Sequence, residues 1–242
     1  MIRVIYFIIL SYFILGAVGF FFINRKKGAD EKRKSWIKYI TYAIIIHILF
    51  FSIVINPFVF RVLAVFITGV GFYELFRLLQ KSGRTALRFF LFSMVVYVLL
   101  SFGFLLFSGL DKGLILFSFL ILSVFDSFSQ ITGQLWGRRK IFPKISPQKT
   151  WEGAIGGGLV AVISALLFDF LIDRPALRAV QLAAGIVVFA FAGDVLASYY
   201  KRKYNVKDFS SLIPGHGGFL DRFDSLIAGG AWVACNELFL NL

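Results

Sequence analysis

The sequence is poor in the residues on which most soluble active sites and disulfide scaffolds depend. Among its 242 residues are one cysteine, two histidines and 13 acidic residues. The single cysteine, Cys235, excludes an intrachain disulfide and a metal site built from several cysteines. Charged residues make up only 16% of the chain, which is too few to cover the surface of a soluble domain of this length.

Hydrophobic residues make up most of the chain instead. They form 59% of it, aromatic residues form 18%, and the mean hydropathy is +0.82. The apolar runs do not alternate with a period of two, which excludes a membrane β-barrel. A run of about 20 apolar residues can cross the hydrocarbon core as a helix. Such runs lie at 2–23, 39–59, 61–79, 88–108, 113–134, 154–172, 179–199 and 225–241.

We therefore predict an all-α integral membrane protein, a polytopic bundle of about eight transmembrane helices with residues 1–242 as a single polytopic membrane domain. The first run lacks a strongly basic start and a small-residue cleavage motif, so we interpret it as a retained span. Most basic residues fall in alternate connecting segments, and basic loops stay in the cytosol. We expect a multi-pass protein of the cell (inner) membrane with these segments in the cytosol: 24–38, 77–88, 132–152 and 201–224.

One of these connecting segments, 198–224, holds the parts of a phosphate site. It supplies a hydroxyl, several cations, the glycine-rich turn 214–218 and two carboxylates. Glycines let the backbone approach phosphate oxygens, cations neutralise the phosphate charge, and carboxylate oxygens suit Mg²⁺. The alternative is a solvated basic loop that only sets the topology.

Two predicted spans carry polar faces. In the fifth span, one stripe about 100° wide holds polar residues around Asp126, and a carboxylate facing lipid costs several kcal/mol. The stripe therefore predicts a cytosol-facing polar cavity; the alternative is a polar contact between helices. In the seventh span, Asp194, Ser198 and Lys201 share one face, for which the alternative is a structural Asp194–Lys201 pair. Glu74 is expected to pair with Arg77 at i+3, with no role in the chemistry.

The spacing of the segment 198–224 resembles the signature of the phosphatidate cytidylyltransferase family, also called CDP-diacylglycerol synthases. The matching pattern is Ser198-x2-Lys201-Arg202-x4-Lys207-Asp208-x-Ser210-x2-Ile213-Pro214-x-His216-Gly217-Gly218-Phe219-x-Asp221-Arg222-Phe223-Asp224. The segment 145–153, ISPQKTWEG, is similar to the family's other cytosolic loop. Two places depart from the family pattern: Tyr200, where the family prefers an aliphatic residue or Phe, and Ser127-Phe128 after Asp126. The second departure leaves open whether the chain is a main synthase or a paralogue with a shifted lipid preference.

The resemblance implies a catalytic half at 111–242, with 1–110 mainly as scaffold. It implies transfer of the cytidylyl group of CTP to phosphatidic acid from the inner leaflet, with Mg²⁺ and a possible second cation as cofactors. The implied metal ligands are Asp194, Asp221 and Asp224. The catalytic residues would be Asp194, Ser198, Lys201, Arg202 and Asp221, and the substrate-binding residues Asp126, Lys149, Lys207, His216, Gly217 and Gly218.

Three other functions compete with this one. The first is a cytidylyl or phosphoryl transferase for another lipid, and the second is a cation-coupled transporter that uses Asp126 and Asp194 as a relay. The third, a CDP-alcohol phosphotransferase, needs an Asp-Gly dipeptide that the sequence lacks. The net charge of +13 lies in short loops between spans, so we expect no nucleic-acid partner; a homodimer is possible.

Overall fold

The structure is a computed structural model that describes residues 2–25, 28–82 and 87–240. Helices make up most of the chain, and a two-stranded antiparallel hairpin interrupts them after the fifth helix. The helices are α1 (Ile2–Asn24), α2 (Ala29–Ile55), α3 (Pro57–Lys81), α4 (Leu87–Phe107), α5 (Lys112–Trp136), α6 (Trp151–Phe168), α7 (Ala176–Lys203) and α8 (Leu220–Cys235). The remaining elements are β1 (Lys140–Phe142), β2 (Ser146–Thr150), the 3₁₀-helix η1 (Asp169–Leu171) and the π-helical turn η2 (Asn236–Leu240).

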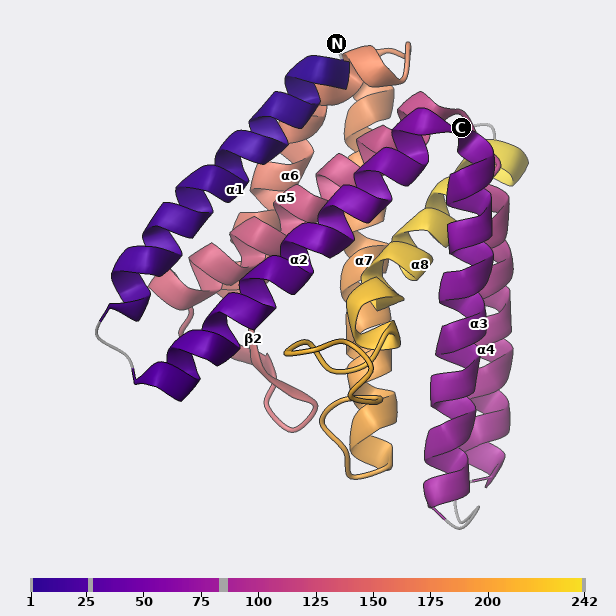
Figure 1. The fold of residues 1–242 in the computed structure, drawn as a ribbon. Helices are drawn as coiled ribbons and strands as arrows, with labels where there is room; N and C mark the ends of the chain where they lie inside the picture. Colours follow the sequence, from indigo (N-terminus) through magenta and orange to yellow (C-terminus); the bar gives the residue numbers. More distant parts are fainter. Residues whose placement is uncertain (1, 26–27, 83–86, 241–242) are drawn as a thin grey trace.

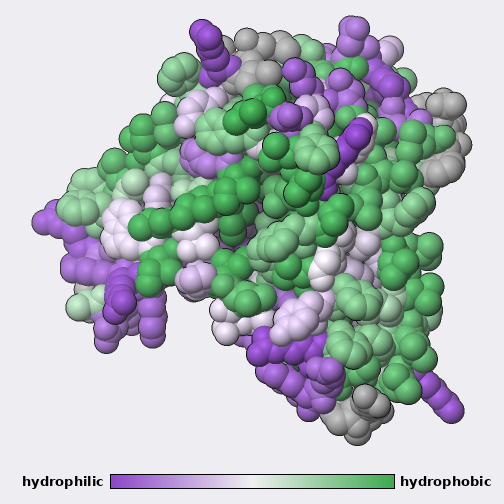
Figure 2. Space-filling model, turned by 45° about the vertical axis from the view of Figure 1, so that its right-hand side comes forward, coloured by the Kyte–Doolittle hydropathy of each residue, from purple (hydrophilic) through white to green (hydrophobic). Residues whose placement is uncertain are grey.

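The helices confirm an all-α polytopic membrane protein. Six of those described are long and apolar enough to cross a membrane, namely α2, α3, α4, α5, α6 together with η1, and α7. Neither α1 nor the 16-residue α8 is among these six, so the count of about eight spans stays a prediction. Figure 2 shows a broad hydrophobic band over the molecule, with hydrophilic residues gathered toward its ends. Such a band is typical of a surface that meets lipid.

The central helix of the fold is α8. It lies beside α7 and also contacts α3, α4 and α5 (Figure 1). Most of its side chains are buried, and small residues let its neighbours approach closely. A Cβ added at Gly193 of α7 would lie 2.8 Å from the carbonyl oxygen of Asp224. The first turn of α8 is therefore held tightly against the last third of α7.

The boundaries of two helices differ from the predicted ones. We predicted a span at 39–59, but α2 begins at Ala29, inside the basic segment. Asp30 and Glu31 lie in its first turn, where negative charge stabilises a helix N-terminus. The next boundary falls at Asn56, whose side chain accepts a 2.9 Å hydrogen bond from the Phe58 N–H, and Pro57 occupies the first position of α3.

Candidate active site

The hairpin β1–β2 positions the segment that resembles the family's other loop. Its second strand ends at Thr150, whose hydroxyl accepts a 3.1 Å hydrogen bond from the Gly153 N–H and so caps α6. The Glu152 carboxylate accepts hydrogen bonds from the N–H groups of Arg138 and Arg139. The sequence analysis did not predict this hairpin, although these contacts fix the direction in which Lys149 leaves the strand.

Lys149 forms the first of two lysine–aspartate pairs. Its Nζ lies 2.5 Å from Oδ2 of Asp194 on α7, and the two side chains are 20% and 38% exposed. The Ser198 hydroxyl donates a 3.3 Å hydrogen bond to Oδ1 of the same carboxylate. Asp194 is thus still partly accessible to a ligand. The prediction that Asp194 and Ser198 share one face of the helix is confirmed. The alternative Asp194–Lys201 pair is wrong, because Lys201 has another partner.

That partner is Asp221, in the first turn of α8. Lys201 Nζ lies 2.5 Å from Asp221 Oδ1, and the side chains are 10% and 2% exposed. The other oxygen, Oδ2, accepts hydrogen bonds from the Phe209 N–H at 2.9 Å and the Gly218 N–H at 2.8 Å. Asp221 is therefore buried with three contacts, whereas Asp194 is 38% exposed and has two, of which the hydrogen bond from Ser198 is long.

Arg202 ties the hairpin to the loop after α7. Its Nε donates a 3.0 Å hydrogen bond to the Ile145 carbonyl, and its Nη1 donates a 2.8 Å hydrogen bond to the Val206 carbonyl. Lys207, which we predicted to bind substrate, is exposed in the same loop. The structure thus gives Arg202 a bracing role between the two family-like segments, while Lys207 faces solvent.

The glycine-rich turn is built around backbone conformations that favour glycine. Gly215 and Gly217 have φ values of +75° and +84°, a region that side-chain-bearing residues rarely adopt. The His216 ring stacks on Tyr42 of α2 with 6.4 Å between ring centroids, and its buried Nδ1 has no hydrogen-bond partner. Burial, with the charge of Arg222, lowers the pKa of His216 below 6.5, so the imidazole is neutral at pH 7.

Two further carboxylates lie near Asp194. Asp126 on α5 and Asp224 on α8 both interact electrostatically with it, and Asp224 also with Lys201. Within the described ranges, no three His, Cys, Asp or Glu side chains lie close enough to hold a metal ion by themselves. Asp194, Asp221 and Asp224 therefore do not form a ready-made metal site, and their role as metal ligands stays a prediction.

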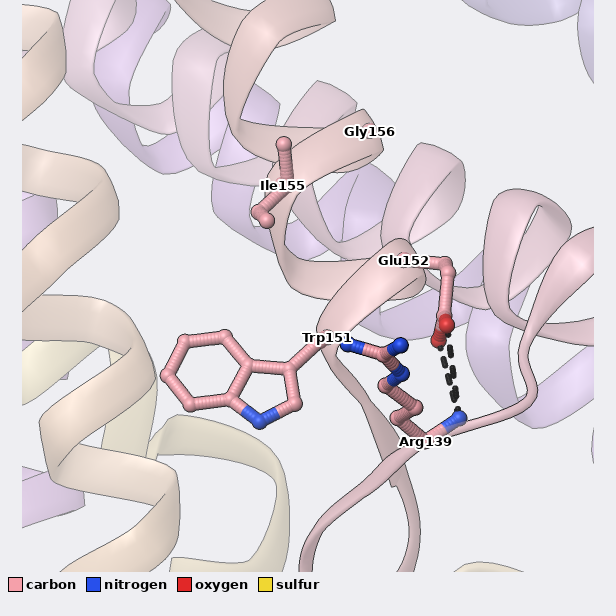
Figure 3. Close-up of a pocket in the computed structure, with 5 residues that line it drawn as sticks. All are labelled: Arg139, Trp151, Glu152, Ile155 and Gly156. Atoms are coloured by element: carbon pink, nitrogen blue, oxygen red, sulfur yellow. Dashed lines mark hydrogen bonds between the residues drawn. The ribbon is translucent and has the colours of Figure 1, made fainter.

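The polar stripe of α5 is largely open to the surface. Four of its members, Asp126, Ser127, Gln130 and Gln134, are exposed, which disfavours a polar contact between helices as their role. A surface hollow of about 660 Å³ lies beside the hairpin, lined by Arg139, Trp151, Glu152, Ile155 and Gly156 (Figure 3). None of the predicted site residues lines this hollow, so the predicted polar cavity stays a prediction.

Glu74 of α3 is the residue whose partners the sequence analysis predicted wrongly. Its carboxylate contacts the loop and the start of α8, so the expected pair with Arg77 is wrong. Tyr200, the departure from the family pattern, donates a 2.9 Å hydrogen bond to the Leu75 carbonyl next to Glu74. A phenylalanine could not make this bond. An ionisable residue within an apolar span is itself a signal of function, and that signal could have drawn attention to Glu74.

Comparisons with known proteins agree with the pattern of the site. A model of the cytidylyltransferase family matches residues 83–238. The chain is 41% identical over 121 residues to a phosphatidate cytidylyltransferase of Haemophilus influenzae, covering 48% of this chain and 42% of that protein. It is 39% identical over 132 residues to one from Rickettsia felis (51% and 58% covered) and 40% identical over 104 residues to one from Bacillus subtilis (42% and 39% covered). The chain spans about half the length of the curated relatives it matches.

Proposed function

The chain belongs to the cytidylyltransferase family, and on that premise we propose that it joins CTP and phosphatidic acid to give CDP-diacylglycerol and pyrophosphate. One observation carries the proposal: two lysine–aspartate pairs, Lys149–Asp194 and Lys201–Asp221, lie along the C-terminal part of α7, the second of them at the start of α8. The names of the matched relatives support the choice of phosphatidic acid as acceptor.

In this reaction a phosphate oxygen of the lipid attacks the α-phosphorus of CTP. The new P–O bond forms as the bond to the β-phosphate oxygen breaks, and pyrophosphate leaves. The attacking oxygen is already anionic, so no strong general base is needed. The protein has to bring two polyanions together and neutralise their charge, and Lys149 and Lys201 are the cations closest to the carboxylates.

The residues at this site also fit a magnesium ion. Mg²⁺ usually binds through one or two carboxylates and completes its shell with water and substrate phosphates, so a preformed cluster of three acids is not required. Asp194 is the better primary ligand because its carboxylate is 38% exposed and holds one lysine and one long hydrogen bond. Asp221 is already saturated, and Asp224 and Asp126 would support the charge. When bound, the ion would neutralise charge on the leaving pyrophosphate.

Lys149 would exchange Asp194 for a phosphate of the substrate. An ammonium group is a compact charge on a flexible stem and can change partners. Ser198 would then keep Asp194 oriented through its hydroxyl. The lowered pKa of His216 keeps its ring neutral, so a ring N–H could donate a hydrogen bond to a phosphate oxygen without adding charge. Gly217 and Gly218 would leave room for that approach.

The membrane arrangement is part of the same proposal. We place about eight spans in the cell membrane, with the two lysine–aspartate pairs facing a polar cavity on the cytosolic side, where CTP is available. Phosphatidic acid would enter from the inner leaflet. The clustering of basic residues supports this orientation. Cysteines introduced singly at Lys149 or His216 in a Cys235→Ser background should resist a membrane-impermeant thiol reagent in intact cells; labelling from outside would reverse the topology. Light scattering in detergent would test whether the protein forms a homodimer.

Nucleotide binding tests the function itself. Purified protein should bind CTP more tightly than ATP, and the Lys149→Gln variant should bind it more weakly. A cation-coupled transporter would show no such binding. Offering phosphatidic acid beside other phosphorylated lipids then separates the proposed acceptor from the alternative lipid classes.

A further inference from the structure

Glu74 is a buried carboxylate that the proposed mechanism does not use. It lies on α3 with 0% of its surface exposed. Its Oε1 accepts hydrogen bonds from the Ser210 hydroxyl at 2.5 Å and the Phe219 N–H at 2.8 Å, and its Oε2 accepts one from the Leu220 N–H at 2.7 Å. Among the residues that the structure describes, no lysine, arginine or histidine forms an ion pair with it.

These contacts satisfy the start of α8. The first N–H groups of a helix have no partner within the helix, and the residue at the N-terminal boundary of α8, Phe219, makes no side-chain cap. Glu74 supplies the missing acceptor from another helix, and the positive end of the helix dipole stabilises its charge. A buried carboxylate is costly without such partners, so the carboxylate and the helix start depend on each other.

The first turn of α8 also carries Asp221, the partner of Lys201. Gly218 donates its N–H to Asp221, and Phe219, the next residue, donates its N–H to Glu74. A Cβ at Gly218 would lie 2.8 Å from Glu74 Oε1 and 2.9 Å from Asp221 Oδ2, so two carboxylates enclose this glycine. Ser210 and Phe219, two positions of the family-like pattern, thus donate hydrogen bonds to Glu74, which lies outside the segment 83–238 that the family model matches.

We propose that Glu74 is a positioning residue: it fixes the first turn of α8 and so keeps the Asp221 carboxylate in its ion pair with Lys201. The bond from Tyr200 to the Leu75 carbonyl holds α3 against α7 one residue further along, so α3 contacts both helices that carry the pair. This inference rests on the proposed function only for its effect on turnover; its effect on the Lys201–Asp221 contact can be measured without substrate.

The test compares Glu74→Gln and Glu74→Asp with wild type and with the control Thr68→Val. Thr68 is a buried residue of the same helix, and its hydroxyl bonds only carbonyls of its own helix. The glutamine amide has the shape of the glutamate carboxylate but lacks its charge. Its NH₂ group would also face an N–H donor of Phe219 or Leu220, which then loses its acceptor. In metal-free protein, an amine-reactive reagent should label Lys201 of Glu74→Gln roughly tenfold faster than in wild type. Labelling of Lys34, which is exposed, serves as the internal reference.

Turnover then separates positioning from a purely structural role. A structural defect lowers the folded fraction and so the apparent kcat, with KM for CTP unchanged and Lys201 labelling unchanged in the folded protein. Positioning predicts a roughly ten- to hundredfold loss in kcat/KM per folded enzyme for Glu74→Gln and partial recovery in Glu74→Asp, which keeps the charge. Thr68→Val should match wild type in both measurements.

The outcomes are distinguishable. If wild type transfers no cytidylyl group, the proposed function fails, while Lys201 labelling still decides the inference. If wild type is active but folded Glu74→Gln labels and turns over like wild type, the inference is overturned and the function stands. If Glu74→Gln does not fold, faster Lys201 labelling in Glu74→Asp supports the inference and unchanged labelling refutes it.

Discussion

The helix pair α7 and α8 carries ionic contacts at both of its ends, and only one end has the features of a reaction site. Where α7 begins, Arg174 and Arg178 contact Glu237 at 2.6 and 3.2 Å, and Arg178 also bonds the Asn236 side chain at 2.6 Å. Where α7 ends, lysines pair with Asp194 and Asp221. The arginines join the start of α7 to the continuation of α8, and Lys201–Asp221 joins its end to α8, while Lys149–Asp194 joins α7 to β2. Ion pairing between α7 and α8 therefore does not by itself identify the site.

The two ends differ in how fully their charges are used. Glu237 is 9% exposed and takes two arginines, whose planar groups hold a fixed geometry. At the other end the Lys201–Asp221 pair is buried too, but Lys149 carries its charge on a flexible stem, Asp194 is 38% exposed, and two more carboxylates lie nearby. Charge that is accessible and incompletely paired can bind a ligand, whereas saturated buried charge fastens the helices.

The largest expected effect separates the two aspartates of the site. Asp194→Asn should remove most turnover, on the order of a hundredfold or more, with little loss of stability because the carboxylate is half-exposed. Asp221→Asn should lose turnover and also stability, since breaking a buried pair costs about 3–5 kcal/mol. Turnover per folded enzyme and thermal unfolding would be measured for both. Equal stability losses would contradict the distinction between an open and a saturated carboxylate.

The next effect concerns the cations. Lys201→Gln and Lys149→Gln should each reduce kcat/KM roughly ten- to hundredfold, because each removes one charge-assisted contact. Lys207→Gln should cost less, since Lys207 is exposed, and Lys32→Gln in the first basic segment should cost little. Assays at matched amounts of membrane protein would rank the four variants. Similar rates in all of them would show that these charges only set the topology.

A smaller effect is expected at the opposite end. Arg178→Met should lower the free energy of unfolding by about 1–3 kcal/mol, because buried acceptors lose a charged donor, while kcat and KM of the folded enzyme stay unchanged. Thermal unfolding and turnover would be measured together. A specific loss of turnover without destabilisation would mean that both ends of the pair take part in the reaction.

The smallest effect is a pH dependence at His216. Its pKa is lowered below 6.5 mainly by burial, so folding favours the neutral ring. That contribution to stability is fully present above pH 6.5 and is lost as the pH falls through the lowered pKa of the folded state. The difference in melting temperature between wild type and His216→Gln should therefore shrink from pH 7 toward pH 5. A difference that grows on acidification would reverse the sign of the pKa shift.

Much of this architecture could be predicted from the sequence. Apolar runs located the helices because a bilayer demands long uniform segments, and helical spacing placed Asp194 beside Ser198. The partners of Lys201 and Glu74 could not be predicted, since both depend on how α8 packs. Glu74 bonds Leu220, which lies 146 residues away in the sequence. The hairpin was missed because its strands are short and polar, and the contacts that hold it, from Arg202 to Ile145, are also tertiary.

The most direct test of the central claim is a transfer assay with CTP labelled at the α-phosphate. Purified protein in detergent with Mg²⁺ should move the label into a lipid only when phosphatidic acid is added, and Asp194→Asn should abolish this transfer while Arg178→Met retains it. Label transfer that ignores phosphatidic acid, or that survives in folded Asp194→Asn, would contradict the account.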